Sequence, residues 1–247
     1  KGAAPRLSRG GEPVQQLLNL SAFAEQMLIH EHACVAIDKD MPFDRAAVLG
    51  CAVTTGAGTI FNAIKLTPGE SVAVIGCGGV GLAAINAAKI AGAGMIIAAD
   101  PLPEKRALAE TLGATHTIDA LAEDAASQIV KLSGGGVHYG IEAVGRQASA
   151  DLAVASLRRG GTAVVLGMMP LDCKVGLGAM DLLGGKKLMG AIMGMNLTWA
   201  GQSCGSTSRV FLHASHYDAV LEKIVAGCTH YVPGDPTDPK TTMGPLI

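Results

Sequence analysis

The sequence has 247 residues, a formal net charge of −2 and a charged fraction of 16%, which is low beside the usual ~25%. This length is enough for one large domain or two modest ones whose core needs no disulfide bonds. The small net charge argues against nucleic acid and anionic membranes as partners. The longest apolar region, residues 72–99, is interrupted by glycines, Asn86 and Lys89, so no membrane span is predicted.

The six cysteines are scattered and form no Cys-x-x-Cys pair. No basic segment followed by an apolar one opens the sequence, so nothing in it indicates export. A disulfide scaffold is therefore not expected. We predict a cytoplasmic location.

Residues 1–54 differ in character from the rest. Leu20–Ala36 has strand-like apolar spacing, Pro42 marks a turn, and a short helix is expected near Arg45–Leu49. These features indicate the last part of a β-rich domain, most of which would lie upstream of this sequence.

From Ser71 onward, strand and helix signals alternate, which is typical of a parallel sheet covered by helices. Helices fill the gaps between the strands, and Pro103 and Gly113 suit the start and end of one of them. The predicted strands are Ser71–Ile75, Met95–Ala99, Thr115–Ile118, Val137–Ile141, Thr162–Leu166 and Lys187–Met193. The predicted helices are Val80–Ala91, Pro103–Leu112, Ala122–Leu132 and Gln147–Leu157.

A glycine motif, Gly76-Cys77-Gly78-Gly79-Val80-Gly81, joins the first strand to the first helix, and Asp100 ends the next strand. In the dinucleotide-binding pattern the first glycine permits a tight turn, the second lets the backbone approach the pyrophosphate, and the third lets helix and sheet pack closely. An acid at the next strand end binds the ribose. The alternative is an ordinary strand-to-helix connection, but the pattern favours NAD.

The last segment, from Leu197, holds the single tryptophan, an amphipathic stretch at Tyr217–Ala226 and a tail rich in proline, aspartate and glycine at residues 232–239. Proline prevents this tail from continuing a helix or a central strand. The segment therefore does not extend the strand-helix alternation.

Residues 1 to about 196 resemble the zinc-containing medium-chain alcohol dehydrogenases. The resemblance rests on Ser21–Glu25, Leu49–Gly56, Val74–Gly81 and Glu142–Arg146. It implies an α/β fold: a doubly wound parallel Rossmann sheet for NAD at residues 55–196, preceded at 1–54 by a remnant of the β-rich, GroES-like catalytic domain. The expected activity is hydride transfer between an alcohol and NAD.

The same resemblance assigns roles to individual residues. Cys51 corresponds to the third zinc ligand. The other two ligands are absent from this sequence and a single thiolate cannot form a tetrahedral site, which favours the alternative that Cys51 is a small buried residue without zinc. Asp100 implies NAD rather than NADP because its carboxylate repels a 2′-phosphate. The implied cofactor-binding residues are Thr55, Gly76, Gly78, Gly79, Val80, Gly81, Asp100, Lys105, Val144 and Arg146.

Residues 197–247 instead resemble the aldehyde dehydrogenases, through Gly201–Cys204, Ser208–Phe211, Gly234–Pro236 and Met243–Ile247. On this resemblance Cys204 is the catalytic nucleophile. Its thiolate would attack an aldehyde, the thiohemiacetal would pass a hydride to NAD(P), and water would release the acid. The family's general base has no counterpart here, so Cys204 is open to reading as a reactive or an inert thiol.

The two resemblances meet at Gly194–Asn196, which predicts a chimaera. Three functions follow: an NAD-dependent alcohol dehydrogenase, an aldehyde dehydrogenase acting through Cys204, or an NAD-binding module without activity. The expected partner is a small alcohol or aldehyde, and the Rossmann domain is expected to support a homo-oligomer.

Overall fold

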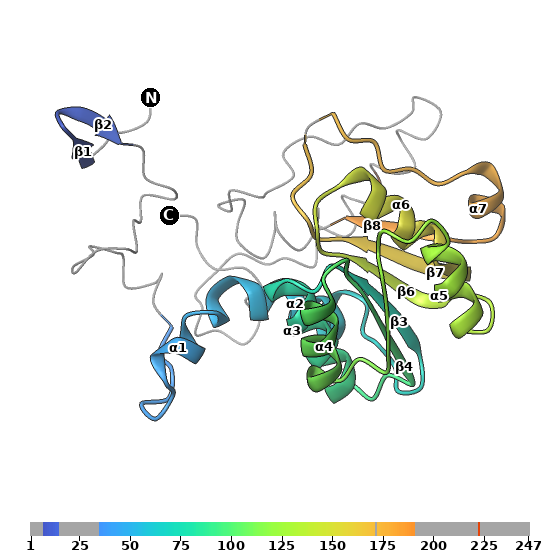
Figure 1. Ribbon diagram of the computed structural model, residues 1–247, viewed down its shortest axis with the longest axis horizontal. Coiled ribbons are helices and arrows are strands. Elements are labelled where there is room, and N and C mark those ends of the chain that lie inside the picture. The colour runs from blue at the N-terminus through green and yellow to red at the C-terminus, as the bar shows by residue number, and fades with distance from the viewer. Residues whose placement is uncertain (1–6, 15–34, 171, 191–221, 223–247) are drawn as a thin grey trace.

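The computed structural model describes residues 7–14, 35–170, 172–190 and 222 (Figure 1). It begins with an antiparallel pair of short strands, β1 (Leu7–Arg9) and β2 (Glu12–Val14). The strand-like stretch predicted from Leu20 lies almost wholly outside the described residues, and so does the helix expected from Tyr217. The short helix α1 spans Phe43–Ala46, a little earlier than predicted.

A continuous helical run follows α1. It comprises a π-helical segment η3 (Leu49–Val53), the α-helix α2 (Thr54–Gly58) and a second π-helical segment η4 (Thr59–Ala63). The sequence did not predict this run, because threonine and glycine have low helix propensity. The domain boundary expected after residue 54 falls inside it, and the division into domains stays a prediction.

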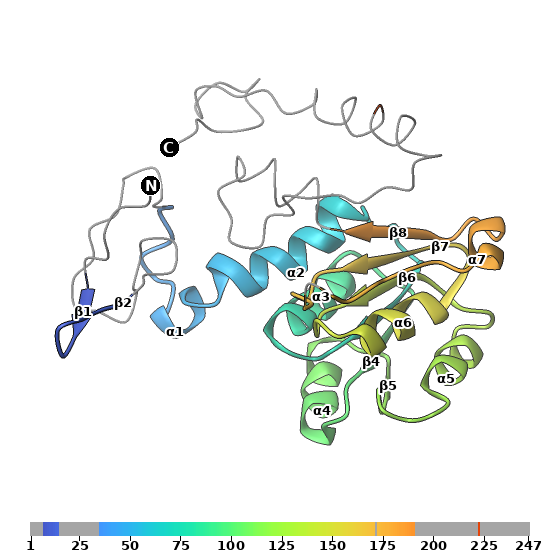
Figure 2. The ribbon, with the colours of Figure 1, turned by 90° about the horizontal axis from the view of Figure 1, so that it is seen from above.

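Six parallel strands form the central sheet in the order β5-β4-β3-β6-β7-β8 (Figures 1 and 2). This order starts at the middle strand β3, runs to one edge, and then returns to fill the other side. The predicted doubly wound α/β fold is therefore confirmed. The strands are β3 (Ser71–Ile75), β4 (Met95–Ala99), β5 (His116–Ile118), β6 (Val137–Glu142), β7 (Leu157–Val165) and β8 (Lys187–Gly190).

Helices cover both faces of this sheet, and alternate residues of each strand pack against them. On β3, Val72 and Val74 belong to the core under α3 (Gly79–Ile90) and α4 (Pro103–Leu112). The intervening Ala73 and Ile75 belong to the core under α5 (Ala125–Leu132) and α6 (Gln147–Ala155). Burial on both faces explains why these strands are continuously apolar.

The structure differs from the sequence prediction around β7 and before β8. The helix expected to end at Leu157 ends at Ala155, and β7 begins at Leu157, because this residue pairs with Val137 of β6. β8 is described to Gly190, and the rest of its predicted range lies outside the described residues. A short helix, α7 (Ala179–Leu183), precedes β8 and was not predicted. Within the described part of the chain, no helix has the length and apolar character to cross a membrane.

Candidate dinucleotide site

The glycine motif forms the connection between β3 and α3, and each glycine meets a different constraint. Gly76 has φ +98°, which L side chains rarely adopt. A Cβ on Gly81 would overlap the carbonyl oxygen of Gly76, so only glycine allows α3 to lie this close to the turn. Gly78 is exposed, and a Cβ there would have nothing within 4 Å. The motif is therefore closed toward the sheet and open to solvent at Gly78.

Gly78 is also the N-cap of α3. The first N–H groups of an α-helix lack partners within the helix, and the helix dipole makes this end attractive to anions. Open space at Gly78 therefore lies where a phosphate group would meet free backbone donors. The residues present fit the pyrophosphate of a dinucleotide.

The helical run 49–63 packs directly on this motif. Ala52 Cβ would lie 3.2 Å from a Cβ at Gly79, and a Cβ at Gly56 would collide with the backbone of Val80. Glycine at position 56 thus lets α2 approach the first turn of α3. Thr55, which sequence reasoning assigned to the cofactor, lies on this run next to the close contact.

Asp100 lies directly after β4 and is 9% exposed. Its Oδ2 accepts a hydrogen bond of 2.8 Å from the Cys77 amide, and its Oδ1 accepts one of 2.9 Å from the Leu102 amide. The carboxylate is therefore fixed against the glycine turn. A carboxylate has about four lone-pair sites, so two remain for donors such as ribose hydroxyls.

Two basic residues, Lys105 and Arg106, lie near Asp100 and the turn. Arg106 donates from Nη1 to the carbonyl oxygens of Asp100 and Pro101, at 2.6 and 2.9 Å. Lys105 and Arg106 both favour the thiolate of Cys77, but burial and the Asp100 charge act against it and raise the pKa of Cys77 to about 12. Cys77 is therefore an inert core residue of the motif, not a nucleophile.

Val144 and Arg146, the other predicted cofactor residues, lie in the loop after β6 and are both exposed. Val144 Cγ2 would lie 2.5 Å from a Cβ at Gly76, so the loop packs against the glycine turn. The structure thus brings together the predicted residues on β3, β4 and β6 at the carboxyl edge of the sheet. At this edge, where the strand order reverses, open α/β sheets bind their ligands.

The predicted zinc ligand Cys51 is exposed in η3, so the reading as a buried residue was wrong. Within residues 7–14, 35–170, 172–190 and 222, no three His, Cys, Asp or Glu side chains gather as a metal site. Structural or catalytic zinc requires three or four protein ligands. The described residues therefore do not fit a zinc site. The predicted nucleophile, Cys204, lies outside them.

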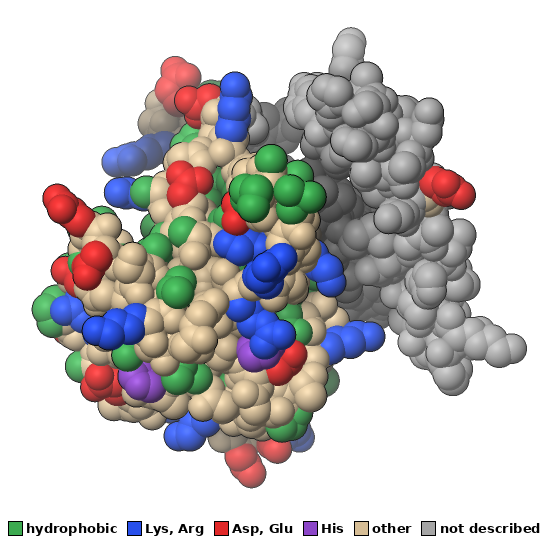
Figure 3. Space-filling view, turned by 90° about the vertical axis from the view of Figure 1, so that its right-hand side faces the viewer, with side chains coloured by type: hydrophobic (Ala, Val, Ile, Leu, Met, Phe, Trp, Pro, Cys, Tyr) green, Lys and Arg blue, Asp and Glu red, His purple; other side chains and the backbone are tan. Residues whose placement is uncertain are grey.

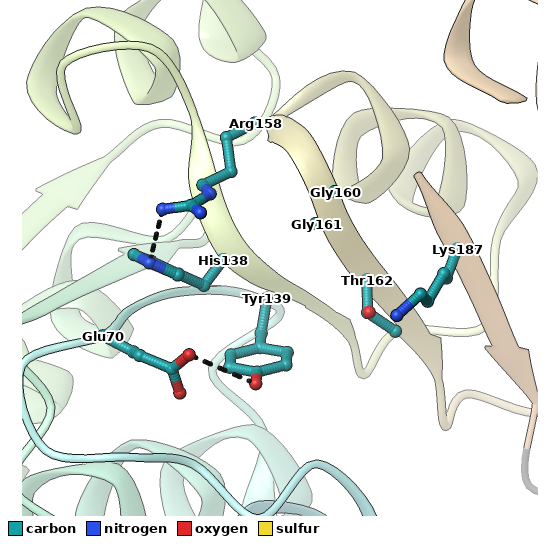
Figure 4. A pocket seen from close by; sticks show the side chains of 8 residues that line it. All are labelled: Glu70, His138, Tyr139, Arg158, Gly160, Gly161, Thr162 and Lys187. Atoms are coloured by element: carbon teal, nitrogen blue, oxygen red, sulfur yellow. Dashed lines mark hydrogen bonds between the residues drawn. The ribbon is translucent and has the colours of Figure 1, made fainter. Parts of the chain in front are cut away.

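A polar hollow of about 160 Å³ lies at the opposite edge, where the strands begin, and none of the sequence-predicted site residues lines it (Figure 4). Figure 3 views the molecule from this side and shows several Lys and Arg side chains on this face. The lining residues are Glu70, His138, Tyr139, Arg158, Gly160, Gly161, Thr162 and Lys187. Helix C-termini point to this edge of a parallel sheet, so it offers no dipole for an anion.

His138 in this hollow gives a prediction about pH. Burial and the Arg158 guanidinium, whose Nη1 lies 2.6 Å from His138 Nε2, lower the pKa of His138, and Glu70 opposes them. The unfolded chain then takes up the proton first as the pH falls below about 6.5. Stability is fully present above that value and declines below it.

We expect the free energy of unfolding, measured by urea denaturation, to fall between pH 7.5 and pH 5.5, and to fall less in His138→Gln. An equal fall in both proteins would contradict a neutral His138 in the folded state.

The fold, the glycine turn and the fixed Asp100 define a protein of the Rossmann class. Comparison with family models matches residues 79–203 to the zinc-binding dehydrogenases, about half of the chain. The chain belongs to the zinc-binding dehydrogenase family. Residues 178–247 match the aldehyde dehydrogenase family.

Relatives of known name agree with this assignment. Alcohol dehydrogenase-like 5 of Arabidopsis thaliana is 38% identical over 74% of this chain and 48% of its own length. S-(hydroxymethyl)glutathione dehydrogenase of Synechocystis is 35% identical over 78% and 54%. The chain thus spans about half the length of these relatives.

Solved structures give the same result. An alcohol dehydrogenase zinc-binding domain protein from Burkholderia ambifaria has a TM-score of 0.68 at 31% identity, covering 88% of this chain and 62% of its own. Benzyl alcohol dehydrogenase from Acinetobacter calcoaceticus has a TM-score of 0.61 at 31% identity, covering 81% and 52%. A zinc-binding dehydrogenase from Sinorhizobium meliloti, bound to NADP, has 0.53 at 32%, covering 57% and 42%.

Proposed function

We propose that this chain is the coenzyme-binding part of an NAD-dependent alcohol dehydrogenase. The observation that carries the proposal is the open backbone at Gly78, beside a carboxylate fixed 2.8 Å from the Cys77 amide. The amides at the start of α3 bind the pyrophosphate, and Asp100 accepts from the ribose hydroxyls. NAD is favoured over NADP because the Asp100 carboxylate repels a 2′-phosphate.

In this proposal the loop residues Val144 and Arg146 flank the adenine, Lys105 holds the ribose from the side, and Thr55 and Val80 lie by the nicotinamide. Bound NAD supplies the hydride acceptor in alcohol oxidation. The chain's own residues hold and orient it. Because the described residues do not fit zinc, no step is assigned to a metal.

The proposal is tested by calorimetric titration of the purified chain with NADH, together with assays of both activities. We expect saturable NADH binding, with neither alcohol-dependent nor aldehyde-dependent NADH formation. Absence of binding heat would overturn the proposal. Alcohol turnover by the zinc-loaded chain would show instead that it is a complete dehydrogenase.

A second candidate function is aldehyde oxidation through Cys204. It is favoured by the match of residues 178–247 to the aldehyde dehydrogenase family. Its signature is NAD(P)-dependent aldehyde oxidation that a thiol reagent abolishes and that Cys204→Ser removes.

Three further properties belong to this proposal. The family matches overlap at residues 178–203, which supports a chimaeric chain with its junction near Gly194–Asn196. Met180, Leu182 and Leu183 of α7 are exposed by 61 to 78% beside the edge strand, which supports a homo-oligomer formed through the Rossmann domain. We place the protein in the cytoplasm.

A further inference from the structure

Glu142, the last residue of β6, is a carboxylate at 0% exposure, and its acceptors are filled by neutral donors. Oε1 accepts from the Val144 amide at 2.8 Å and from the Gly145 amide at 2.7 Å. Ser149 Oγ lies 2.7 Å from the same oxygen, and Oε2 accepts from the Gly167 amide at 3.1 Å. A buried charge is costly unless it is hydrogen-bonded in this way.

These bonds join the loops that follow two neighbouring strands. Val144 and Gly145 follow β6, whereas Gly167 follows β7. The Gly167 amide donates to Glu142 Oε2 at 3.1 Å and, at the longer distance of 3.3 Å, to the backbone carbonyl oxygen of Glu142. The fit is close, because a Cβ at Gly167 would lie 2.6 Å from Glu142 Oε2 and one at Gly145 would collide with the Met168 carbonyl oxygen. The carboxylate thus accepts from amides of both loops.

The loop held in this way is one wall of the dinucleotide site. Val144 packs on Gly76, and Arg146 begins α6 with its amide 3.3 Å from Ser149 Oγ, the same hydroxyl that meets Glu142. Glu142 also lies between Ile75 of β3 and Val165 of β7 in the sheet register. Its carboxylate therefore fixes the position of Val144 and Arg146 relative to the glycine turn.

We propose that Glu142 is a positioning residue for the coenzyme, acting through the Val144–Arg146 loop. This inference rests on the proposed function. Glutamine has nearly the same shape but one acceptor oxygen, so in Glu142→Gln the amide NH₂ must face at least one backbone N–H donor. A donor left without a partner opens that part of the loop.

The test compares wild type, Glu142→Gln and the matched control Glu12→Gln, which changes an exposed glutamate of β2. Hydrogen exchange measured without coenzyme reports how well the amides of the loop are protected. In Glu142→Gln at least one of the amides of Val144, Gly145 and Gly167 is expected to exchange at least about tenfold faster. Calorimetry is expected to show NADH binding weakened at least about tenfold, with the control unchanged.

A role through the loop is separated from a loss of general stability by adding Arg146→Ala. If Glu142 acts by placing Arg146, the loss caused by Arg146→Ala should largely disappear in the Glu142→Gln background, whereas independent effects would add. Ser149→Ala, which removes one donor and keeps the carboxylate, should weaken NADH binding less than Glu142→Gln and provides the readout if Glu142→Gln does not fold.

The outcomes separate the two proposals. If the wild type binds NADH, three results would each overturn the positioning role and leave the proposed function standing. They are equal NADH binding by Glu142→Gln, unchanged hydrogen exchange at all three amides, and additive effects of Glu142→Gln and Arg146→Ala. If Glu142→Gln does not fold, NADH binding by Ser149→Ala equal to wild type overturns the role. Failure of the wild-type chain to bind NADH would overturn the proposed function and, with it, this inference.

Discussion

Replacing Gly78 by alanine is expected to weaken NADH binding by at least about tenfold while leaving the fold intact. The added methyl group meets no protein atom within 4 Å, and φ −80° and ψ −172° suit any residue. The free energy of unfolding should therefore fall by no more than about 1 kcal/mol, the typical cost of an alanine at an N-cap. The methyl group instead occupies the space left for the pyrophosphate.

The matched variant is Gly81→Ala, the same chemical change three residues further on. Its methyl group would overlap the Gly76 carbonyl oxygen, which is backbone and cannot rotate away. Overpacking of this kind costs about 1–3 kcal/mol or more. Urea denaturation should show this loss for Gly81→Ala only. If Gly78→Ala bound NADH as tightly as wild type, the phosphate site would have to lie elsewhere.

Replacing Asp100 by asparagine is expected to lower both NADH affinity and stability. Asparagine has one acceptor oxygen, so its NH₂ must face the amide of either Cys77 or Leu102. Leaving a buried donor unpaired costs about 1–3 kcal/mol. Loss of the negative charge also removes the repulsion of a 2′-phosphate, so the ratio of NADPH to NADH affinity should rise.

Asp119→Asn is the control for this variant. Asp119 follows β5 as Asp100 follows β4, and its Oδ1 accepts from the Leu121 amide at 2.9 Å, as Asp100 Oδ1 accepts from Leu102. Asp119 is exposed, so asparagine should keep its single bond and change neither property. An unchanged coenzyme preference in Asp100→Asn, measured by calorimetry with both coenzymes, would contradict the role of Asp100.

The sheet was predictable because its signals are local. Each strand is a short apolar run, and the glycines at 76, 78 and 81 have spacing that reflects one turn. The position of Asp100 at a strand end also follows from the chain order. The assignment of Val144 and Arg146 to the same site came from the family resemblance, and it agrees with the rule that the carboxyl ends of parallel strands meet at one edge.

What the sequence missed depends on contacts between distant residues. The helical run 49–63 forms despite weak local propensity, because Gly56 allows it to pack on the start of α3. Glu142 was read only as part of a family motif. No spacing rule shows that its side chain accepts from the amides of Val144 and Gly145 and also from the amide of Gly167, just after the neighbouring strand β7.

The position of β8 as the outermost strand has an evolutionary consequence. Because, among the strands that the structure describes, this strand has only β7 as a neighbour, a genetic exchange of the sequence that follows it interrupts none of the interior strands. β8 comes after all the residues of the proposed coenzyme site. These are the turn at Gly76, the carboxylate of Asp100 and the hydrogen-bonded Glu142. Recombination after β8 can therefore leave the proposed coenzyme-binding residues intact while it replaces the sequence that follows them.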